Sequence, residues 1–210
     1  MPGEKFDINL IPKILRPRRR ELDAMTYRKM RLPKGLQKTR LRDLKPPVDK
    51  AARDIVRVLD TLVGPLARIY IFHGGAHGQH TTLAAGLMQL AHMFGFLTMW
   101  TDLAEMRSYE SPMVDEERTL YSSAFEVDVL VVDCSSTQDL VGNRVNTTDF
   151  RRILRKRILE NRTTIVNLSG AIDEFLPDET RKFKDLFMHS ASRVLLLDAD
   201  TGNLGSISNW

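Results

Sequence analysis

Short apolar runs alternate with stretches of helical spacing along most of the chain. The runs are rich in branched and aromatic residues, as strands buried on both faces are. Five such strands are predicted: Ala67–His73, Gly95–Thr101, Val127–Cys134, Thr163–Ser169 and Arg193–Asp198. The polar stretch after the last of them, 199–210, is expected to be a tail.

The stretches between these runs have apolar residues at intervals of three and four, which predicts amphipathic helices. Helices are expected at 48–62, 81–94, 102–110, 149–162 and 177–190, with one short helix near 21–31. Strands that alternate with helices predict a parallel sheet covered on both faces. We therefore expect a three-layer α/β/α domain with five parallel strands over residues 48–210, preceded by an N-terminal arm at 1–47.

The composition fits a globular protein and adds two limits. Hydrophobic residues make up 42% of the 210 residues and charged residues 28%. The sequence has no apolar run long enough for a membrane span, and its N-terminus has no apolar core of a secretory signal. A single cysteine, Cys134, cannot form an internal disulfide and suits the cytoplasm or another reducing compartment.

Positive charge is concentrated at the N-terminus. Residues 1–50 contain 15 lysines and arginines against 6 acids, whereas the other 160 residues contain 16 against 21. A basic arm on an acidic body suggests contact with nucleic acid or an acidic partner; the alternative is a solubilising tail. The candidate contacts in the arm are Arg16, Arg18, Arg19, Arg20, Arg28, Lys29 and Arg31.

The expected helix at 149–162 is a second basic feature. Its cations include Arg157 and Arg162, and the candidate contacts are Arg151, Arg152, Arg155 and Lys156. This helix would follow a phosphate backbone or dock an acidic partner. An ordinary solvated helix face is an equally good interpretation.

The stretch Ile69–Ala84, IYIFHGGAHGQHTTLA, has the order of a phosphate-binding loop: strand, glycine-rich turn, threonine and helix. Such loops surround phosphates with backbone N–H groups, and add a lysine and a hydroxyl that binds magnesium. Aligned on the helix, Thr81 takes the hydroxyl position and His80 the lysine position. Asp133, after the third strand, would be the acid of the magnesium shell. The candidate nucleotide-binding residues are Gly74, Gly75, Gly78, His80, Thr81, Thr82 and Asp133.

Four replacements weaken the phosphate chemistry of this loop. Histidine is shorter than lysine and mostly neutral at pH 7. Gln79 and His77 stand where glycines are usual, and Cys134 stands where an acid often orients the attacking water. These replacements predict a loop that is retained for folding and anion contact, without efficient ATP hydrolysis. Binding of ATP or ADP with magnesium stays open, and no other cofactor is expected.

Other chemistry near the loop has less support. His73, His77 and His80, with Cys134, offer imidazole and thiol ligands for zinc, but their spacing matches no familiar zinc site. A nucleophilic cysteine would need a lowered pKa, and no motif around Cys134 predicts one. We therefore predict neither a metal site nor a catalytic residue.

The chain as a whole resembles the AAA+ ATPases of the bacterial and phage replicative helicase loader family, with the related transposase-helper ATPases. The resemblance covers about residues 32–198 and rests on the order and spacing of motifs. Six segments of the chain are similar to segments of this family: LPKGLQKTRLRDLKP before the first helix, IYIFHGGAHGQHTTLA, GFLTMWTDLAEMR, VDVLVVDC, FRRILRKRILENRTTIVNLS and RVLLLD. The resemblance implies that Asn167 or Ser169 is the sensor-1 polar residue. The arginine finger of the family would fall at 184–186, where the chain has Lys-Asp-Leu.

With the lysine, a loop glycine, the second acid and the finger replaced, the resemblance implies a pseudo-ATPase, whose fold serves as a binding platform. The implied partner is a replicative helicase or another replication or recombination component, with nucleic acid at the basic arm. Two alternatives stay open: a structural subunit of a nucleoprotein assembly, anchored by the arm, and an active ATPase with unconventional ligands.

Overall fold

The sheet of the protein has five parallel strands and one antiparallel strand. The structure, a computed structural model, describes residues 22, 24–57, 67–74, 78–103, 123–134, 144–168, 185–186 and 192–206. Its strands lie in the order β2-β3-β4-β1-β5-β6. Their bounds are β1 Ala67–His73, β2 Thr98–Asp102, β3 Val129–Asp133, β4 Thr163–Asn167, β5 Ser192–Asp198 and β6 Asn203–Ser206. The five parallel strands confirm the sequence prediction.

The sixth strand corrects the prediction that residues 199–210 are only a polar tail. β6 pairs antiparallel with β5, so that Leu197 lies opposite Leu204 and Asp198 opposite Asn203. A tight turn joins the two strands, and the amide of Gly202 donates to the carbonyl of Asp198 at 2.8 Å. The sequence of β6 lacks an apolar pattern because this strand lies at the edge of the sheet.

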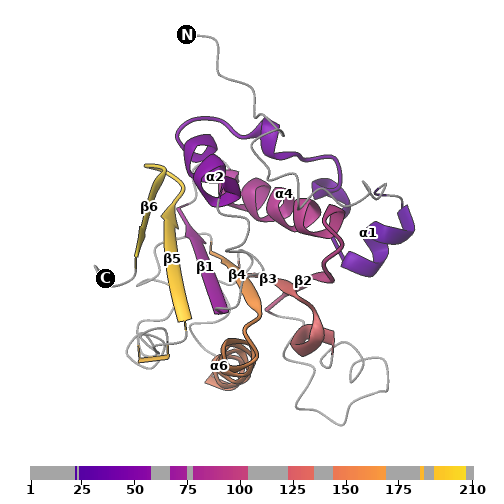
Figure 1. Cartoon of the computed structure of the whole chain (residues 1–210), viewed down its shortest axis with the longest axis vertical. Helices are drawn as coiled ribbons and strands as arrows, with labels where there is room; N and C mark the ends of the chain where they lie inside the picture. The colour runs from indigo at the N-terminus through magenta and orange to yellow at the C-terminus, as the bar shows by residue number, and fades with distance from the viewer. Residues whose placement is uncertain are drawn as a thin grey trace.

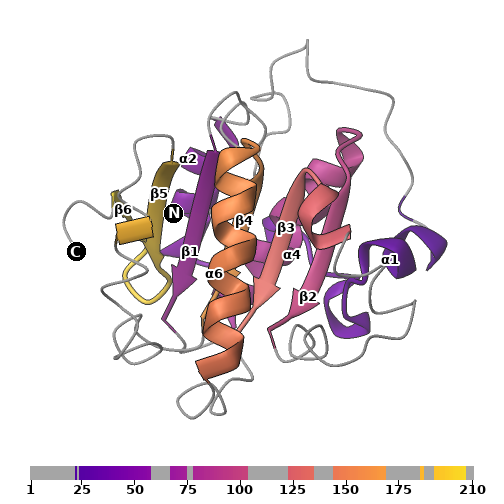
Figure 2. The same cartoon turned by 90° about the horizontal axis from the view of Figure 1, so that it is seen from below.

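Helices cover both faces of the sheet, as Figures 1 and 2 show. On one face lie α2 (Val48–Arg57) and α4 (Gln79–Met93), and on the other lies α6 (Arg144–Leu159). Side chains along β1 alternate between the two layers: Tyr70 and Phe72 belong to the core with α4, whereas Ile69 and Ile71 belong to the core with α6. This alternation explains why the strand is apolar throughout.

The helices expected at 48–62, 81–94 and 149–162 correspond to α2, α4 and α6. Asp102, the first residue of the helix expected at 102–110, instead ends β2. α4 begins two residues before the expected 81–94, and α6 begins five residues before the expected 149–162. α2 is described as far as Arg57. The helices predicted at 102–110 and 177–190 lie almost wholly outside the described residues.

Residues 24–47 pack onto the domain. They contain α1 (Ala24–Met30) and two short 3-10 helices, η3 (Lys34–Leu36) and η4 (Leu41–Asp43). Four of their side chains are buried in the core with α2 and α4: Tyr27, Met30, Leu32 and Leu44. We call residues 31–47 the lead-in segment; its ribbon passes from α1 over α4 to α2 (Figure 1).

Among the described residues, none of the helices combines the length and the apolar character that a membrane crossing needs.

Candidate functional site at the carboxyl edge of the sheet

Polar residues end each of the five parallel strands, and the strand register brings them to one edge. Asp102 lies opposite Asp133, which lies opposite Asn167 on the next strand. His73 at the end of β1 lies opposite Asp198 at the end of β5. Ligands of open parallel sheets bind at this carboxyl edge, so the register places two predicted site residues, Asp133 and Asn167, where a ligand would bind.

Three of the predicted residues form one hydrogen-bonded cluster. The Asn167 amide Nδ2 donates to the hydroxyl of Thr81 and to the Oδ1 atom of Asp133, each at 3.0 Å. Asn167 is fully buried, and its Oδ1 atom has no hydrogen-bond partner among the described residues. The cluster joins the hydroxyl at the magnesium position to the acid and to the sensor-1 candidate. These groups suit a hydrated magnesium ion, because it prefers oxygen ligands.

His80 differs from the lysine that its position would hold. Its side chain is only 4% exposed, and its Nδ1 atom has no described hydrogen-bond partner. Burial lowers the pKa of His80, although the carboxylates of Asp133 and Asp200 oppose this shift. The imidazole is therefore neutral at pH 7, and it brings no positive charge to a phosphate.

Carboxylates stand beside the first glycine of the loop. Gly74 has φ +89°, and a Cβ there would lie 3.0 Å from Oδ2 of Asp200 and 3.1 Å from Oδ1 of Asp198. Burial raises the pKa of Asp198, but hydrogen bonds from the Thr201 hydroxyl and the Asp200 amide outweigh it and bring the pKa below its usual value. Asp198 is thus ionised at neutral pH, where it repels a polyphosphate.

The turn before α4 shows where Gln79 directs its side chain. Gly78, with φ +64°, precedes the helix in the left-handed region, where glycine is favoured. The Gln79 Oε1 atom accepts a hydrogen bond of 3.0 Å from the amide of Lys45. The residue that replaces a loop glycine therefore holds the lead-in segment against the start of α4.

Cys134 is buried and unsuited to nucleophilic chemistry. Its side chain is fully buried, and burial together with the carboxylates of Asp133 and Asp102 raises its pKa well above the usual value. The thiol is therefore protonated at neutral pH, and thiolate is the reactive form. Across the described residues, we find no group of three histidine, cysteine, aspartate or glutamate side chains arranged to hold a metal ion.

The basic candidates fall into three groups. On the surface, the exposed residues are Arg28 and Lys29 on α1 and Arg152, Arg155 and Lys156 on α6. Half-buried are Arg31 and Arg151. Thr82 is half-buried at the start of α4. The third group lies outside the described residues and consists of Arg16, Arg18, Arg19 and Arg20. Three residues named in other predictions lie outside them too: Gly75, His77 and Ser169.

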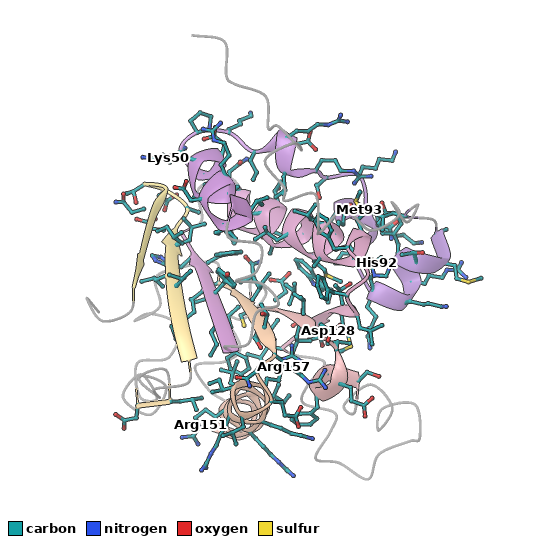
Figure 3. All side chains as sticks on the ribbon, in the orientation of Figure 1. Lys50, His92, Met93, Asp128, Arg151 and Arg157 are labelled. Atoms are coloured by element: carbon teal, nitrogen blue, oxygen red, sulfur yellow. The ribbon has the colours of Figure 1, made fainter. Side chains whose placement is uncertain are left out.

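Arg157, counted among the cations of this basic helix, does not lie on its surface. Its guanidinium is fully buried and faces the sheet, near Asp128 (Figure 3). It donates to the hydroxyl of Thr164 at 2.9 Å and to five backbone carbonyls, those of residues 124, 125, 127, 128 and 163. Burial lowers the pKa of Arg157 to about 9. This arginine ties α6 to β4 and to residues 124–128, and is not available to a partner.

Sequence spacing carries a signal for this burial. Phe150, Ile153, Leu154 and Ile158 are the buried face of α6, and position 157 follows 153 and 154 at helical spacing. Because positions three and four apart share a helix face, a cation at 157 must lie among the apolar residues.

Comparison with known proteins shows the fold. No family model matches the chain, and no curated protein does. A structure of DnaI is similar, with a TM-score of 0.62 and 15% identity over 80% of this chain and 95% of that one. A structure of the DnaC helicase loader has a TM-score of 0.55 and 15% identity, over 78% of this chain and 99% of that one. A structure of DnaA bound to AMPPCP and single-stranded DNA has a TM-score of 0.55 and 19% identity over 77% of this chain. The match covers only 49% of the DnaA chain. The predicted P-loop, AAA+-type fold is thereby confirmed.

Proposed function

We propose that this chain, with its AAA+-type fold, is a catalytically degenerate protein of helicase-loader type. It would bind a protein partner and nucleic acid in DNA replication or recombination. The fold is similar to structures named as a helicase loader and as a replication initiator bound to single-stranded DNA. What those proteins bind suggests the partner class for this chain: a replicative helicase or another replication component.

The observation that carries the degeneracy is the charge around the loop. His80, at the lysine position, is buried and neutral, while Asp198 and Asp200 stand beside Gly74. A triphosphate would approach carboxylates without the cation that normally offsets its charge. This supports a platform that no longer hydrolyses ATP.

One observation favours the alternative of residual nucleotide binding. Thr81, Asn167 and Asp133 keep mutual hydrogen bonds at the magnesium position. These residues fit a hydrated magnesium ion, whereas His80 and the turn at Asp198 do not fit the phosphates that such an ion would accompany. A nucleotide held through the metal alone would bind weakly.

Thermal unfolding with ATP and magnesium tests this choice. A ligand that binds the folded state raises its stability by RT ln(1 + [L]/Kd). Binding of ATP with a Kd of about 1 mM or lower would therefore raise the melting temperature. We expect no shift for the natural chain. A shift that Thr81→Val abolishes would instead support the alternative of magnesium-dependent nucleotide binding.

Affinity capture from the native host tests the partner. The full chain, tagged at its C-terminus, is expected to retain a hexameric helicase, identified by mass spectrometry. Capture of a stable nucleoprotein complex without helicase would contradict the helicase-loader type and favour the structural-subunit alternative.

A further inference from the structure

Five exposed cations occur along the lead-in segment and the first turn of α2. The five are Lys34, Lys38, Arg42, Lys45 and Lys50, and we call them the lead-in surface. The two acids in the same stretch are already engaged. Asp43 accepts from the Arg40 amide at 2.7 Å and lies 3.9 Å from Arg42, and Asp49 pairs with Arg53 at 3.1 Å. The lead-in surface therefore has a clear excess of positive charge.

A partly buried hydrogen-bond network fixes the backbone of the lead-in segment. The Arg40 guanidinium donates to the carbonyls of Gln37 and Thr39 and to the Gln89 Oε1 atom, at 2.7 to 2.8 Å. The Gln89 amide in turn donates to the carbonyls of Leu36 and Thr39. Gln89 is only 2% exposed on α4, so the network joins the lead-in segment to the core.

Close packing fixes the same segment at two more places. A Cβ on Gly86 of α4 would lie 2.7 Å from Leu41, and a Cβ on Gly202 would lie 2.5 Å from Pro47. Both glycines allow backbone and side chains to approach closely. The lead-in surface is therefore preorganised, and a ligand that binds it does not have to order the chain first.

The chemistry of the lead-in surface fits phosphates rather than an apolar partner. Lysine heads are hydrated point charges on flexible stems, which suit phosphate oxygens at varying positions. The exposed large apolar side chains among the described residues are Met25, Leu97 and Leu159, and all three lie outside this surface. Without aromatic side chains it offers no stacking for bases, and contacts of its cations with phosphates carry no sequence information.

The exposed face of α6 is the weaker of the two basic surfaces. Lys156 lies 4.3 Å from the centre of the Phe125 ring and 3.8 Å from Glu160. This leaves Arg152 and Arg155 as the exposed cations of α6 without a described ion pair. α6 and Lys50 lie on opposite sides of the molecule (Figure 3), so one straight stretch of nucleic acid cannot contact both surfaces.

From this charge, rigidity and lack of apolar or aromatic contacts, we propose that the lead-in surface binds the phosphate backbone of a nucleic acid without reading its sequence. This inference rests on the proposed function, which includes nucleic-acid binding, and it names the surface responsible. An acidic protein at this surface is the competing outcome.

Binding of a labelled oligothymidylate and a labelled mixed-sequence duplex to the full chain tests the proposal over a range of salt concentrations. The variant is Lys34→Gln with Lys38→Gln and Lys45→Gln, which removes three charges from the lead-in surface. Each lost phosphate contact makes the slope of log K against log salt shallower by about 0.7 to 0.9. We expect a slope shallower by about 2 to 3 and a roughly hundredfold weaker affinity at about 0.1 M salt.

The matched control is Arg152→Gln with Arg155→Gln and Lys156→Gln, which removes the same charge from α6. This control should keep most of the affinity, and circular dichroism should show both variants folded. Equal losses in both variants, or a larger loss in the control, would overturn the assignment of the surface. So would unchanged binding by the lead-in variant.

Two further outcomes separate this proposal from the proposed function. If the natural chain binds neither oligonucleotide at low salt, both this surface and the nucleic-acid part of the proposed function are wrong. The protein-binding part of the proposed function is tested separately, by the capture of a helicase. If the lead-in variant loses helicase capture but binds DNA as before, the surface is a protein contact and the inference is wrong.

Discussion

The two ends of β4 carry buried polar clusters that differ in one respect. At the start of the strand, Arg157 donates to Thr164 and to five carbonyls, so that each guanidinium nitrogen is hydrogen bonded. At the end, Asn167 donates to Thr81 and Asp133, but its own oxygen has no described partner. Buried polar groups are nearly always satisfied, so the unpaired oxygen of Asn167 is an acceptor that a ligand at this end of the strand could use.

We infer that the Arg157 cluster stabilises the fold and that the Asn167 cluster is the candidate binding site. A complete network rigidifies a fold, and an incomplete one carries a cost that stability alone does not explain. His80, whose Nδ1 atom also lacks a described partner, stands at the incomplete end. Three experiments test the comparison.

The largest effect is expected at Arg157. Arg157→Met removes the donors and leaves several buried carbonyls unpaired, which should lower the free energy of unfolding by about 3 to 5 kcal/mol. Urea denaturation measures this change. Arg155→Met, on the exposed face of the same helix, is the control and should change stability by no more than about 0.5 kcal/mol. Equal effects of the two substitutions would mean that the network at the start of β4 does not stabilise the fold.

A smaller effect is expected at the other end, where the Thr81–Asn167 contact can be isolated. A double-mutant cycle of Thr81→Val and Asn167→Ala should give a coupling of about 0.5 to 1.5 kcal/mol, as one hydrogen bond does. Thr82→Val, whose residue has no described bond to Asn167, should give a coupling near zero in the same cycle. Equal coupling for the two threonines would contradict the cluster.

The smallest effect is a pH dependence from His80. Because burial lowers the pKa of its folded state below 6.5, the unfolded chain binds a proton that the folded chain does not between the two pKa values. The stability that neutral His80 contributes is therefore present above about pH 6.5 and is lost as the pH falls below it. Unfolding free energies from about pH 7 to 5 should decrease for the natural chain and less steeply for His80→Gln. Parallel profiles would show that His80 is not protonated on unfolding.

The sequence predicted the parts of this molecule that depend on local periodicity. Apolar runs located all five parallel strands, and Asp133 was predicted from its place after one of them. Thr81 was predicted from the helix that follows the glycine-rich turn, and Asn167 was one of two residues that the family resemblance implied. The strand predictions succeed because buried strands impose repeating patterns. Contacts of Gln79 and Asp198 were not predictable in this way, since they depend on the fold bringing the lead-in segment and the β5–β6 turn to the loop.

Two other features were missed for different reasons. β6 has no apolar pattern, because an edge strand pairs through its backbone and needs little burial. Arg157 lies on the apolar face of α6 and is buried there, as helical spacing predicts. The sequence prediction instead grouped it with the exposed cations at neighbouring positions.

The burial of Tyr27, Met30, Leu32 and Leu44 limits how far the chain can be shortened. A fragment that begins at Val48 would leave α4 without the side chains that cover it and without the network of Arg40. Such a fragment would expose apolar surface to water and aggregate during expression. A protease that cuts between α1 and α2 would likewise release a segment that the core needs. For recombinant production, the shortest soluble unit must therefore begin before α1.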